Sequence, residues 1–194
     1  PVVGVIGGMG PDATVDLMRR VICATPAKDD ADHIHLLVDN NPKVPSRIAA
    51  LIEGHGESPV PVLVQMAQKL ERAGADLLAI PCNTAHAYLE PIRNAVAIPV
   101  LDMIQMTADR LTELSPRPET VGIIASSAVL KAELYGKALE THGLNVVLPT
   151  ATDQDAVMAL IKKVKSGQVS IADHQRFSDI ANCLVESGAQ AIAV

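Results

Sequence analysis

The fold is decided by residues 2–25, VVGVIGGMGPDATVDLMRRVICAT. The apolar run VVGVIGG is typical of a buried strand, and DATVDLMRRVICAT has the apolar period of a helix. The same alternation continues with expected strands IHLLVDNN, DLLAIPCN and IPVLDM, and with expected helices VPVLVQMAQKLERAG and about His86 to Asn94. Buried strands that alternate with helices predict an α/β fold with parallel sheets covered on both faces.

The pattern restarts in the second half of the chain. ETVGIIASSAV resembles the opening strand and turn, and CLVESGAQAIAV parallels KLERAGADLLAIPC when Gly188–Ala189 is aligned on Gly74–Ala75. We therefore predict two pseudo-symmetric α/β lobes, residues 1–98 and 99–194. The same alignment puts the counterpart of Cys82 at about position 196, so we expect the second lobe to be truncated before it.

Composition narrows the class of protein. Hydrophobic residues make up 48% of the chain and aromatic residues 2%, so the core must be aliphatic and few rings are available to stack on bases. A net charge of −6 without a basic block makes nucleic acid an unexpected partner. No apolar run is long enough for a membrane span and no signal segment leads the chain, so we expect a cytoplasmic protein without membrane contact.

Four loops follow expected strands and should open on the ligand-binding edge of the sheets. They are Gly7–Pro11, Asp39–Pro42, Pro81–His86 and Ala125–Ser127. Cys82 is the first candidate for chemistry, because a thiol before a helix start, with Asn83 or Thr84 as the N-cap, is biased toward thiolate. An inert buried thiol is the alternative, and it is the interpretation that we adopt for Cys23 and Cys183.

Binding groups are expected in the same loops. The Met9–Gly10 turn either offers main-chain N–H groups to an anion or is only a tight strand-to-helix turn without a ligand, and its glycine spacing is not that of a dinucleotide site. Asn40 lies on a turn where its amide either binds a ligand or only shapes the turn. Arg47 follows that turn and is either an ordinary surface arginine or a residue that holds a carboxylate. Lys165 belongs to a cluster with Lys162 and Lys163 that is either a solvated helix face or a source of one ligand contact. His33 and His35 lack zinc-site spacing, and we expect no metal.

Together these loops resemble the aspartate/glutamate racemase family that works without pyridoxal phosphate, and its aspartate-specific members most closely. The resemblance is carried by Gly4–Pro11 with Ala13 and Thr14, by Asn40–Pro42 with Pro45 and Arg47, and by Pro81–His86, and it covers essentially the whole chain in order. It implies two pseudo-symmetric lobes, each a parallel sheet flanked by helices, with the active site in the inter-lobe cleft, usually in a homodimer. It also implies no cofactor.

The resemblance further implies racemisation of an acidic amino acid by two cysteines, one from each lobe, on opposite faces of Cα. Cys82 matches the first of these thiols. The family's second cysteine follows the strand that ends here at Val194, so we interpret the chain as part of a longer protein. By the same resemblance, Met9, Gly10, Asn40, Asn83, Thr84 and Ser126 contact the amino acid, and Arg47 and Lys165 hold its side-chain carboxylate. Aspartate is the expected substrate, with glutamate as the second choice.

Two other functions remain open from the residues. A related thiol enzyme that isomerises or decarboxylates a small diacid would use the same cations, Arg47 and the lysine cluster. A non-catalytic protein that binds an acidic amino acid would need no second cysteine. A pyridoxal enzyme is disfavoured, because no lysine follows an expected strand at a site loop.

Overall fold

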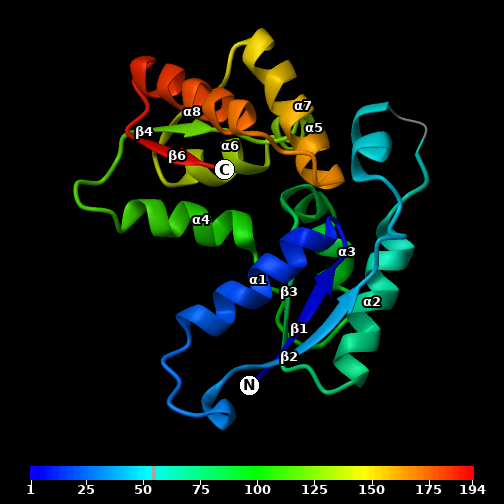
Figure 1. Ribbon diagram of the computed structural model, residues 1–194. Helices are drawn as coiled ribbons and strands as arrows, with labels where there is room; N and C mark the ends of the chain where they lie inside the picture. Colours follow the sequence, from blue (N-terminus) through cyan, green and yellow to red (C-terminus); the bar gives the residue numbers. More distant parts are fainter. Residues whose placement is uncertain (54–55) are drawn as a thin grey trace. The chain divides into compact units, whose positions relative to one another are not determined.

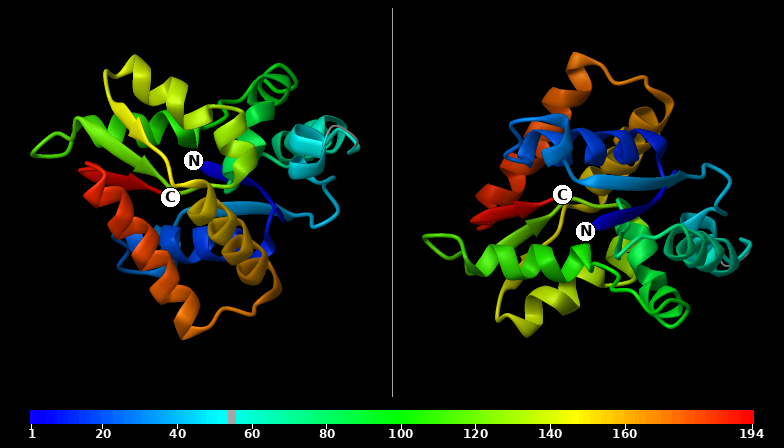
Figure 2. Two further views of the ribbon diagram at one scale, coloured as in Figure 1. Left: turned by 90° about the horizontal axis from the view of Figure 1, so that it is seen from above. Right: turned by 90° about the horizontal axis from the view of Figure 1, so that it is seen from below.

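The computed structural model describes residues 1–53 and 56–194, which form two compact units, Pro1–Met103 and Ile104–Val194. Each unit holds a three-stranded parallel sheet with helices packed against it (Figures 1 and 2). The α/β prediction of two similar lobes is therefore confirmed.

The first unit is ordered β2-β1-β3 across its sheet, so the first strand is central. Its strands are β1 (Val2–Gly7), β2 (His35–Asn40) and β3 (Leu77–Ala79). Its helices are α1 (Pro11–Ala24), α2 (Val60–Arg72) and α3 (Leu89–Arg93), with the short turns η1 (Asp30–Asp32), η2 (Ala49–Glu53) and η3 (Asn83–Tyr88). An aliphatic core that includes Ile6, Leu63 and Leu78 joins the sheet to α2 and α3. Since neighbouring strand residues face opposite ways, the buried Val5 covers the other face.

The second unit repeats this plan with the order β5-β4-β6. Its strands are β4 (Thr120–Ile123), β5 (Asn145–Val147) and β6 (Ala191–Ala193). Its helices are α4 (Met103–Thr112), which begins on the last residue of the first unit, α5 (Ser127–Lys131), α6 (Leu134–Thr141), α7 (Ala151–Ser166) and α8 (Ile171–Glu186). One core cluster packs α4 and α6 against the sheet and a second packs α7 and α8.

The internal repeat extends to individual contacts in the sheets. Gly4 and Gly122 occupy the same place in the two central strands, because Gly4 pairs with Leu78 and Gly122 pairs with Ile192. A Cβ on Gly4 would lie 3.0 Å from Ala75 and 3.2 Å from Leu70. On Gly122 it would lie 3.2 Å from both Ala189 and Leu184, which are the residues that the sequence alignment places opposite. At Gly4 the side chain of Leu78 on the neighbouring strand would lie nearer still, at 2.6 Å, so side chains packed closely against both central strands explain glycine at both positions.

The start of each central strand is also closed in the same way. The carboxylate of Asp76 accepts a hydrogen bond from the N–H of Val2 at 2.6 Å, and the side-chain carbonyl of Gln190 accepts one from the N–H of Thr120 at 3.2 Å. The main-chain N–H of Asp76 donates back to Val2, as that of Gln190 does to Thr120. In each unit, a polar side chain at the same position of the repeat therefore accepts the hydrogen bond of the first N–H of the central strand.

Two predicted elements are corrected. The segment IPVLDM makes only the isolated bridge of Val100 to Leu78, with hydrogen bonds from Leu78 to Pro99 and from Leu101 to Leu78, because Pro99 has no N–H for a longer ladder. The helix expected from about His86 to Asn94 is divided into η3 and α3. Pro91 explains the break, since it cannot donate the hydrogen bond that would continue one α-helix through this segment.

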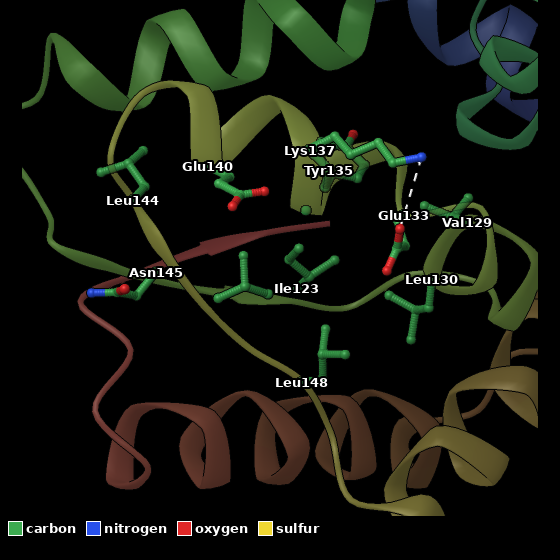
Figure 3. A pocket seen from close by; sticks show the side chains of 12 residues that line it. Ile123, Val129, Leu130, Glu133, Tyr135, Lys137, Glu140, Leu144, Asn145 and Leu148 are labelled. Carbon is green, nitrogen blue, oxygen red and sulfur yellow. Dashed lines mark ion pairs between the residues drawn. The ribbon is translucent and has the colours of Figure 1, made fainter.

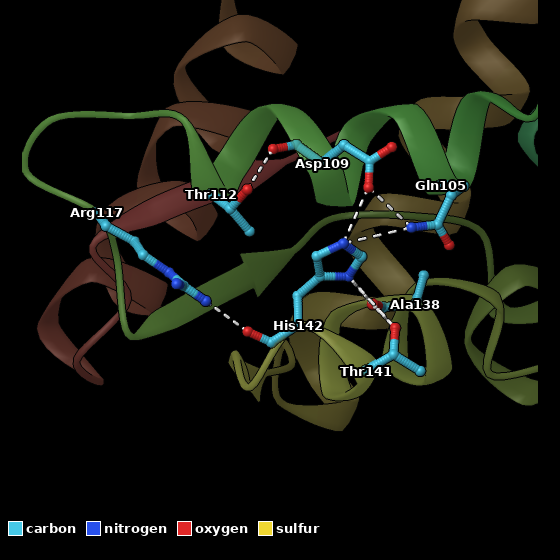
Figure 4. A network of polar contacts seen from close by, with 7 residues as sticks. All are labelled: Gln105, Asp109, Thr112, Arg117, Ala138, Thr141 and His142. Atoms are coloured by element: carbon cyan, nitrogen blue, oxygen red, sulfur yellow. Dashed lines mark hydrogen bonds and ion pairs between the residues drawn. The ribbon is translucent and has the colours of Figure 1, made fainter.

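A polar network joins α4 to the end of α6 in the second unit (Figure 4). The Nε2 atom of His142 lies 2.9 Å from the carboxylate of Asp109, and its Nδ1 atom lies 2.8 Å from the carbonyl oxygen of Ala138. Gln105 donates to the same carboxylate at 2.9 Å. These contacts fix the helix pair that covers one face of the second sheet.

Candidate active site

The carboxyl ends of the three strands of the first unit bring the predicted loops side by side. Gly7 lies opposite Asn40, and Val5 lies opposite Ala79, so the turn after β1 is flanked by the loops that follow β2 and β3. Neighbouring strands are about 4.8 Å apart, which is within reach of one small ligand. Met9, Gly10, Asn40 and Cys82 therefore follow the same edge of one sheet.

The turn after β1 is shaped by Thr14, whose side chain is 1% exposed. Its hydroxyl accepts a hydrogen bond from the N–H of Gly8 at 2.9 Å and lies 3.3 Å from the carbonyl oxygen of Gly10, to which it donates. Helix α1 begins at Pro11 with Gly10 as an N-cap that has no side-chain hydrogen bond. The N-terminal N–H groups of α1 therefore keep the partial positive charge that favours an anion.

Gly8 sets the distance between the first two loops. Its φ is +90°, a conformation that favours glycine, and a Cβ there would lie 2.3 Å from main-chain atoms of Asn41. Asn41 in turn shapes the second loop, because its side-chain oxygen accepts a hydrogen bond from the N–H of Lys43 at 2.9 Å. The neighbouring Asn40 is the last residue of β2 and is exposed. The two loops are thus in direct contact.

Arg47 reaches from the second loop to the first. Its guanidinium donates to the carbonyl oxygens of Pro45 at 3.1 Å, Val44 at 3.3 Å and Met9 at 3.3 Å. All three partners are neutral, and the Nε atom is buried without a hydrogen-bond partner among the residues that the structure describes. An Arg with neutral partners and an unused donor has the chemistry to receive a carboxylate.

Cys82 lies in the third loop, in extended conformation at φ −154° and ψ 108°. Its thiol is free and its side chain is half-buried. The prediction that Asn83 or Thr84 caps the following helix is wrong, because Cys82 itself is the N-cap residue of η3 and no side chain makes a capping bond there. The physical reason is that the chain turns into a 3₁₀ segment directly after Cys82, which makes Asn83 and Thr84 its first helical residues.

His86 connects this loop to the start of α4. Its Nδ1 atom lies 2.9 Å from the carbonyl oxygen of Cys82, and its Nε2 atom lies 3.1 Å from the N–H of Met103. Burial lowers the pKa of His86 below its ordinary value of 6.5, although the Cys82 carbonyl opposes the shift. From the sequence, His86 was recognised only as the last residue of the Pro81–His86 motif, and no role was predicted for it. Its position four residues after Cys82 was the local signal, whereas nothing local pointed to Met103.

In the second unit, Ser126 follows β4 and caps α5, with its hydroxyl 3.4 Å from the N–H of Val129. Helix α7 packs against this loop, since the Gln154 amide donates to Ala125 and Ser127 at 3.0 and 3.1 Å and the Met158 sulfur lies 3.3 Å from the N–H of Ser127. Lys165 is exposed and lies about two turns further along α7 than Met158. The structure therefore does not bring Ser126 and Lys165 together within this unit.

The neighbours of Lys165 have different roles. Lys163 forms an ion pair with Asp173 at 2.6 Å, which joins α7 to α8. Hydrogen bonds from Lys163 and Ser170 lower the pKa of Asp173 to about 2. Lys163 is thus a structural residue of the helix pair. The packing role predicted for Cys23 and Cys183 is wrong, because both thiols are exposed on outward faces of their helices.

A separate pocket of about 400 Å³ lies in the second unit between β4, β5, α5 and α6 (Figure 3). Its lining is mostly apolar, with Ile123, Leu130 and Leu148 among the side chains. Lys137 and Glu133 face each other across 3.8 Å at its rim. The pocket contains neither Ser126 nor Lys165, so it is distinct from the predicted site.

The protein consists of two similar α/β units, and a thiol and an arginine lie in the loops at the carboxyl edge of the first sheet. It therefore belongs to the class of internally repeated α/β proteins with candidate functional residues in strand-end loops. The Asp/Glu/hydantoin racemase family model matches residues 6–194. The chain belongs to this family, as the motifs of the sequence predicted.

Individual relatives agree with this assignment. The chain is 30% identical over 167 residues to the broad specificity amino-acid racemase RacX of Bacillus subtilis, covering 84% of this chain and 70% of that protein. The structure of Picrophilus torridus aspartate racemase is 31% identical, with a TM-score of 0.87 over 98% of this chain and 78% of that one. A glutamate racemase of Francisella tularensis shares the fold at 21% identity, with a TM-score of 0.60 over 99% of this chain and 66% of that one. Among the described residues, no helix combines the length and the apolar character needed to cross a bilayer.

Proposed function

We propose that this protein racemises a small acidic amino acid without a cofactor, with aspartate as the preferred substrate and Cys82 as one of two proton-carrying thiols. The observation that carries the proposal is the half-buried Cys82 thiol on the same sheet edge as Arg47, whose guanidinium donates to the neutral carbonyl oxygens of Val44, Pro45 and Met9. The relatives that are named as aspartate and broad specificity racemases support this choice.

Substrate binding is assigned to the three loops of the first unit. Arg47 holds the side-chain carboxylate, because its guanidinium, whose partners among the described residues are neutral carbonyl oxygens, can form a bidentate pair with it. The main chain of Met9 and Gly10, with Asn40, Asn83 and Thr84, binds the α-amino and α-carboxylate groups. The uncapped start of α1 lies at the same turn and stabilises the negative charge that grows on the α-carboxylate as the Cα proton leaves.

Inversion at Cα needs a proton donor and a proton acceptor on opposite faces of the substrate. In the forward direction the Cys82 thiolate takes the Cα proton and a second thiol returns a proton to the other face; in the reverse direction the roles exchange. By the register of the repeat, the counterpart of Cys82 falls at about position 196, directly after β6. Ser126 and Lys165 are proposed as the contributions of the second unit, and their placement is part of this proposal.

The assembly and location of the protein belong to the same proposal. We expect a homodimer, which analytical ultracentrifugation would detect as twice the chain mass. Three free cysteines, two of them exposed, agree with a reducing cytoplasm, because exposed thiols oxidise in an extracellular environment.

The decisive experiment follows the Cα–H signal of L-aspartate by NMR in deuterated water, with L-glutamate in parallel. We expect loss of the signal with the unmodified protein, and at least a hundredfold slower loss with Cys82→Ser, since serine is a far weaker base than a thiolate. The matched controls, Cys23→Ser and Cys183→Ser, should exchange at the unmodified rate. Arg47→Lys should raise KM about tenfold, the effect of losing one good charge-assisted contact.

The other functions give different outcomes. A decarboxylase would release carbon dioxide, and a diacid isomerase would convert a dicarboxylate that lacks an amino group. A binding protein would retain affinity for aspartate in Cys82→Ser and show no exchange in any variant. Any of these results, or exchange that survives Cys82→Ser, would overturn the racemase proposal.

A further inference from the structure

The His86 ring is held between two main-chain groups that are far apart in the sequence. The side chain is 6% exposed, so each polar atom of the ring needs a partner. Its Nδ1 atom lies 2.9 Å from the carbonyl oxygen of Cys82, and its Nε2 atom lies 3.1 Å from the main-chain nitrogen of Met103. The ring therefore bridges the loop of the proposed thiol and the first residue of α4.

These partners assign the tautomer. The N–H of Met103 can only donate and the Cys82 carbonyl can only accept, so the neutral ring that satisfies both contacts keeps its lone pair on Nε2 and its proton on Nδ1. Burial favours the uncharged ring and lowers the pKa of His86. The main-chain carbonyls of Cys82 and Leu101 and the charge of Asp102 oppose this shift of the pKa, and the charge of Arg93 adds to it. Both ring nitrogens are occupied by the main chain, so the ring has no free atom with which to take a proton from a thiol or a substrate.

The orientation of Cys82 depends on this bridge. The Cys82 carbonyl also accepts a hydrogen bond from the N–H of Ala85 at 3.2 Å. Fixing that carbonyl fixes ψ of Cys82, which is 108°, and with it the direction of the Cα–Cβ bond that carries the thiol. A displacement of a catalytic group by about 1 Å is enough to slow an enzyme a hundredfold. Loss of the hydrogen bond to the Cys82 carbonyl is therefore expected to lower the rate of proton transfer by the thiol.

We propose that His86 is a positioning residue for Cys82, acting as a neutral clamp between the Cys82 carbonyl and the Met103 N–H and not as a proton carrier. This inference rests on the proposed role of the Cys82 thiol. It makes the Nδ1 contact responsible for the rate and the Nε2 contact responsible for anchoring the ring.

Three variants separate these contacts. In His86→Asn the amide nitrogen takes the place of Nδ1, so the bond to Cys82 is kept and the bond from Met103 is lost. In His86→Gln the side-chain oxygen reaches the place of Nε2, so the Met103 bond is kept and the Cys82 bond is lost. His86→Phe keeps the volume of the ring and loses both bonds.

We expect the rate of Cα exchange to follow the Cys82 contact. His86→Gln and His86→Phe should lower kcat at least tenfold with KM within about twofold, and His86→Asn should stay within about threefold of the unmodified kcat, since one hydrogen bond corresponds to about a tenfold change. The melting temperatures of His86→Asn and His86→Gln should fall by similar amounts, because each loses one buried bond. A purely structural role would instead make kcat follow the melting temperature.

A second measurement needs no substrate. In a Cys23→Ser/Cys183→Ser background, the rate of Cys82 alkylation by iodoacetamide should be equal within about twofold for the unmodified residue and His86→Asn, and should change at least threefold in His86→Gln and His86→Phe. This pattern without Cα exchange would overturn the racemase proposal and leave the clamp intact. Equal alkylation in all four proteins, or a kcat pH profile that loses a limb in His86→Phe, would overturn the clamp.

Discussion

Replacing Gly8 with alanine tests whether the close contact between the first two loops forms the candidate site. At a φ of +90°, an alanine costs about 1–3 kcal/mol in backbone conformation. The new Cβ would also lie 2.3 Å from main-chain atoms of Asn41, and main-chain atoms cannot rotate away as a side chain can. Forcing the loops apart should add about 1–3 kcal/mol, so we expect Gly8→Ala to lower the free energy of unfolding by about 2–6 kcal/mol.

The matched control is Gly74→Ala. Gly74 has a similar φ of +97°, but a Cβ there would meet no atom within 4 Å. It should therefore show only the backbone cost, about 1–3 kcal/mol. Urea denaturation followed by circular dichroism gives both values, and Cα exchange at a temperature where both variants are folded gives the rate. If the two variants lose equal stability and equal activity, the contact between Gly8 and Asn41 does not define the site and the reasoning is refuted.

Three further predictions concern buried polar groups. Thr14→Val should lower the free energy of unfolding by about 1–3 kcal/mol, because it leaves the buried N–H of Gly8 without an acceptor, whereas Thr14→Ser should retain most of it; urea denaturation compares the two. Asp173→Asn should destabilise the protein at neutral pH, because it removes the ion pair with Lys163. Since the pKa of Asp173 is lowered from 3.8 to about 2, the extra stability of the unmodified protein is present above about pH 4 and disappears as the pH falls to about 2. Melting temperatures of the two proteins that differ by the same amount across this pH range would contradict the prediction. Because the pKa of His86 is lowered from 6.5, the neutral ring contributes stability above about pH 6.5 that is lost as the pH falls below it. Between pH 7 and 5, the melting temperature of His86→Asn should therefore fall less with pH than that of the unmodified protein. An equal dependence of the melting temperature on pH in both proteins would count against the neutral ring.

Most of the fold could be predicted from local sequence patterns. The alternation of β-branched strands and amphipathic helices predicted two α/β lobes, because each element must bury an apolar face and the apolar period reveals which face it is. The alignment of Gly188 with Gly74 was informative because both glycines follow the end of a helix and have a positive φ, at +100° and +97°, before a buried strand. The motifs around Gly8, Arg47 and Cys82 then identified the family.

The sequence by itself could not decide which partner each side chain takes across the fold. Whether Cys23 and Cys183 were packed, and whether Lys163 or Lys165 was the structural lysine, depended on which helix face met a neighbour. The N-cap after Cys82 depended on a 3₁₀ turn that has no strong local signature.

The bridge from Cys82 through His86 to Met103 shows the same division most clearly. The sequence determined that a thiol and a histidine follow a strand four residues apart, which is a local spacing. Only the tertiary structure brought the N–H of Met103 to the other side of the ring and buried it, because that contact joins residues 17 apart through the packing of the chain around the sheet. Local periodicity specifies elements, whereas burial and the partner of each polar atom are properties of the packed molecule.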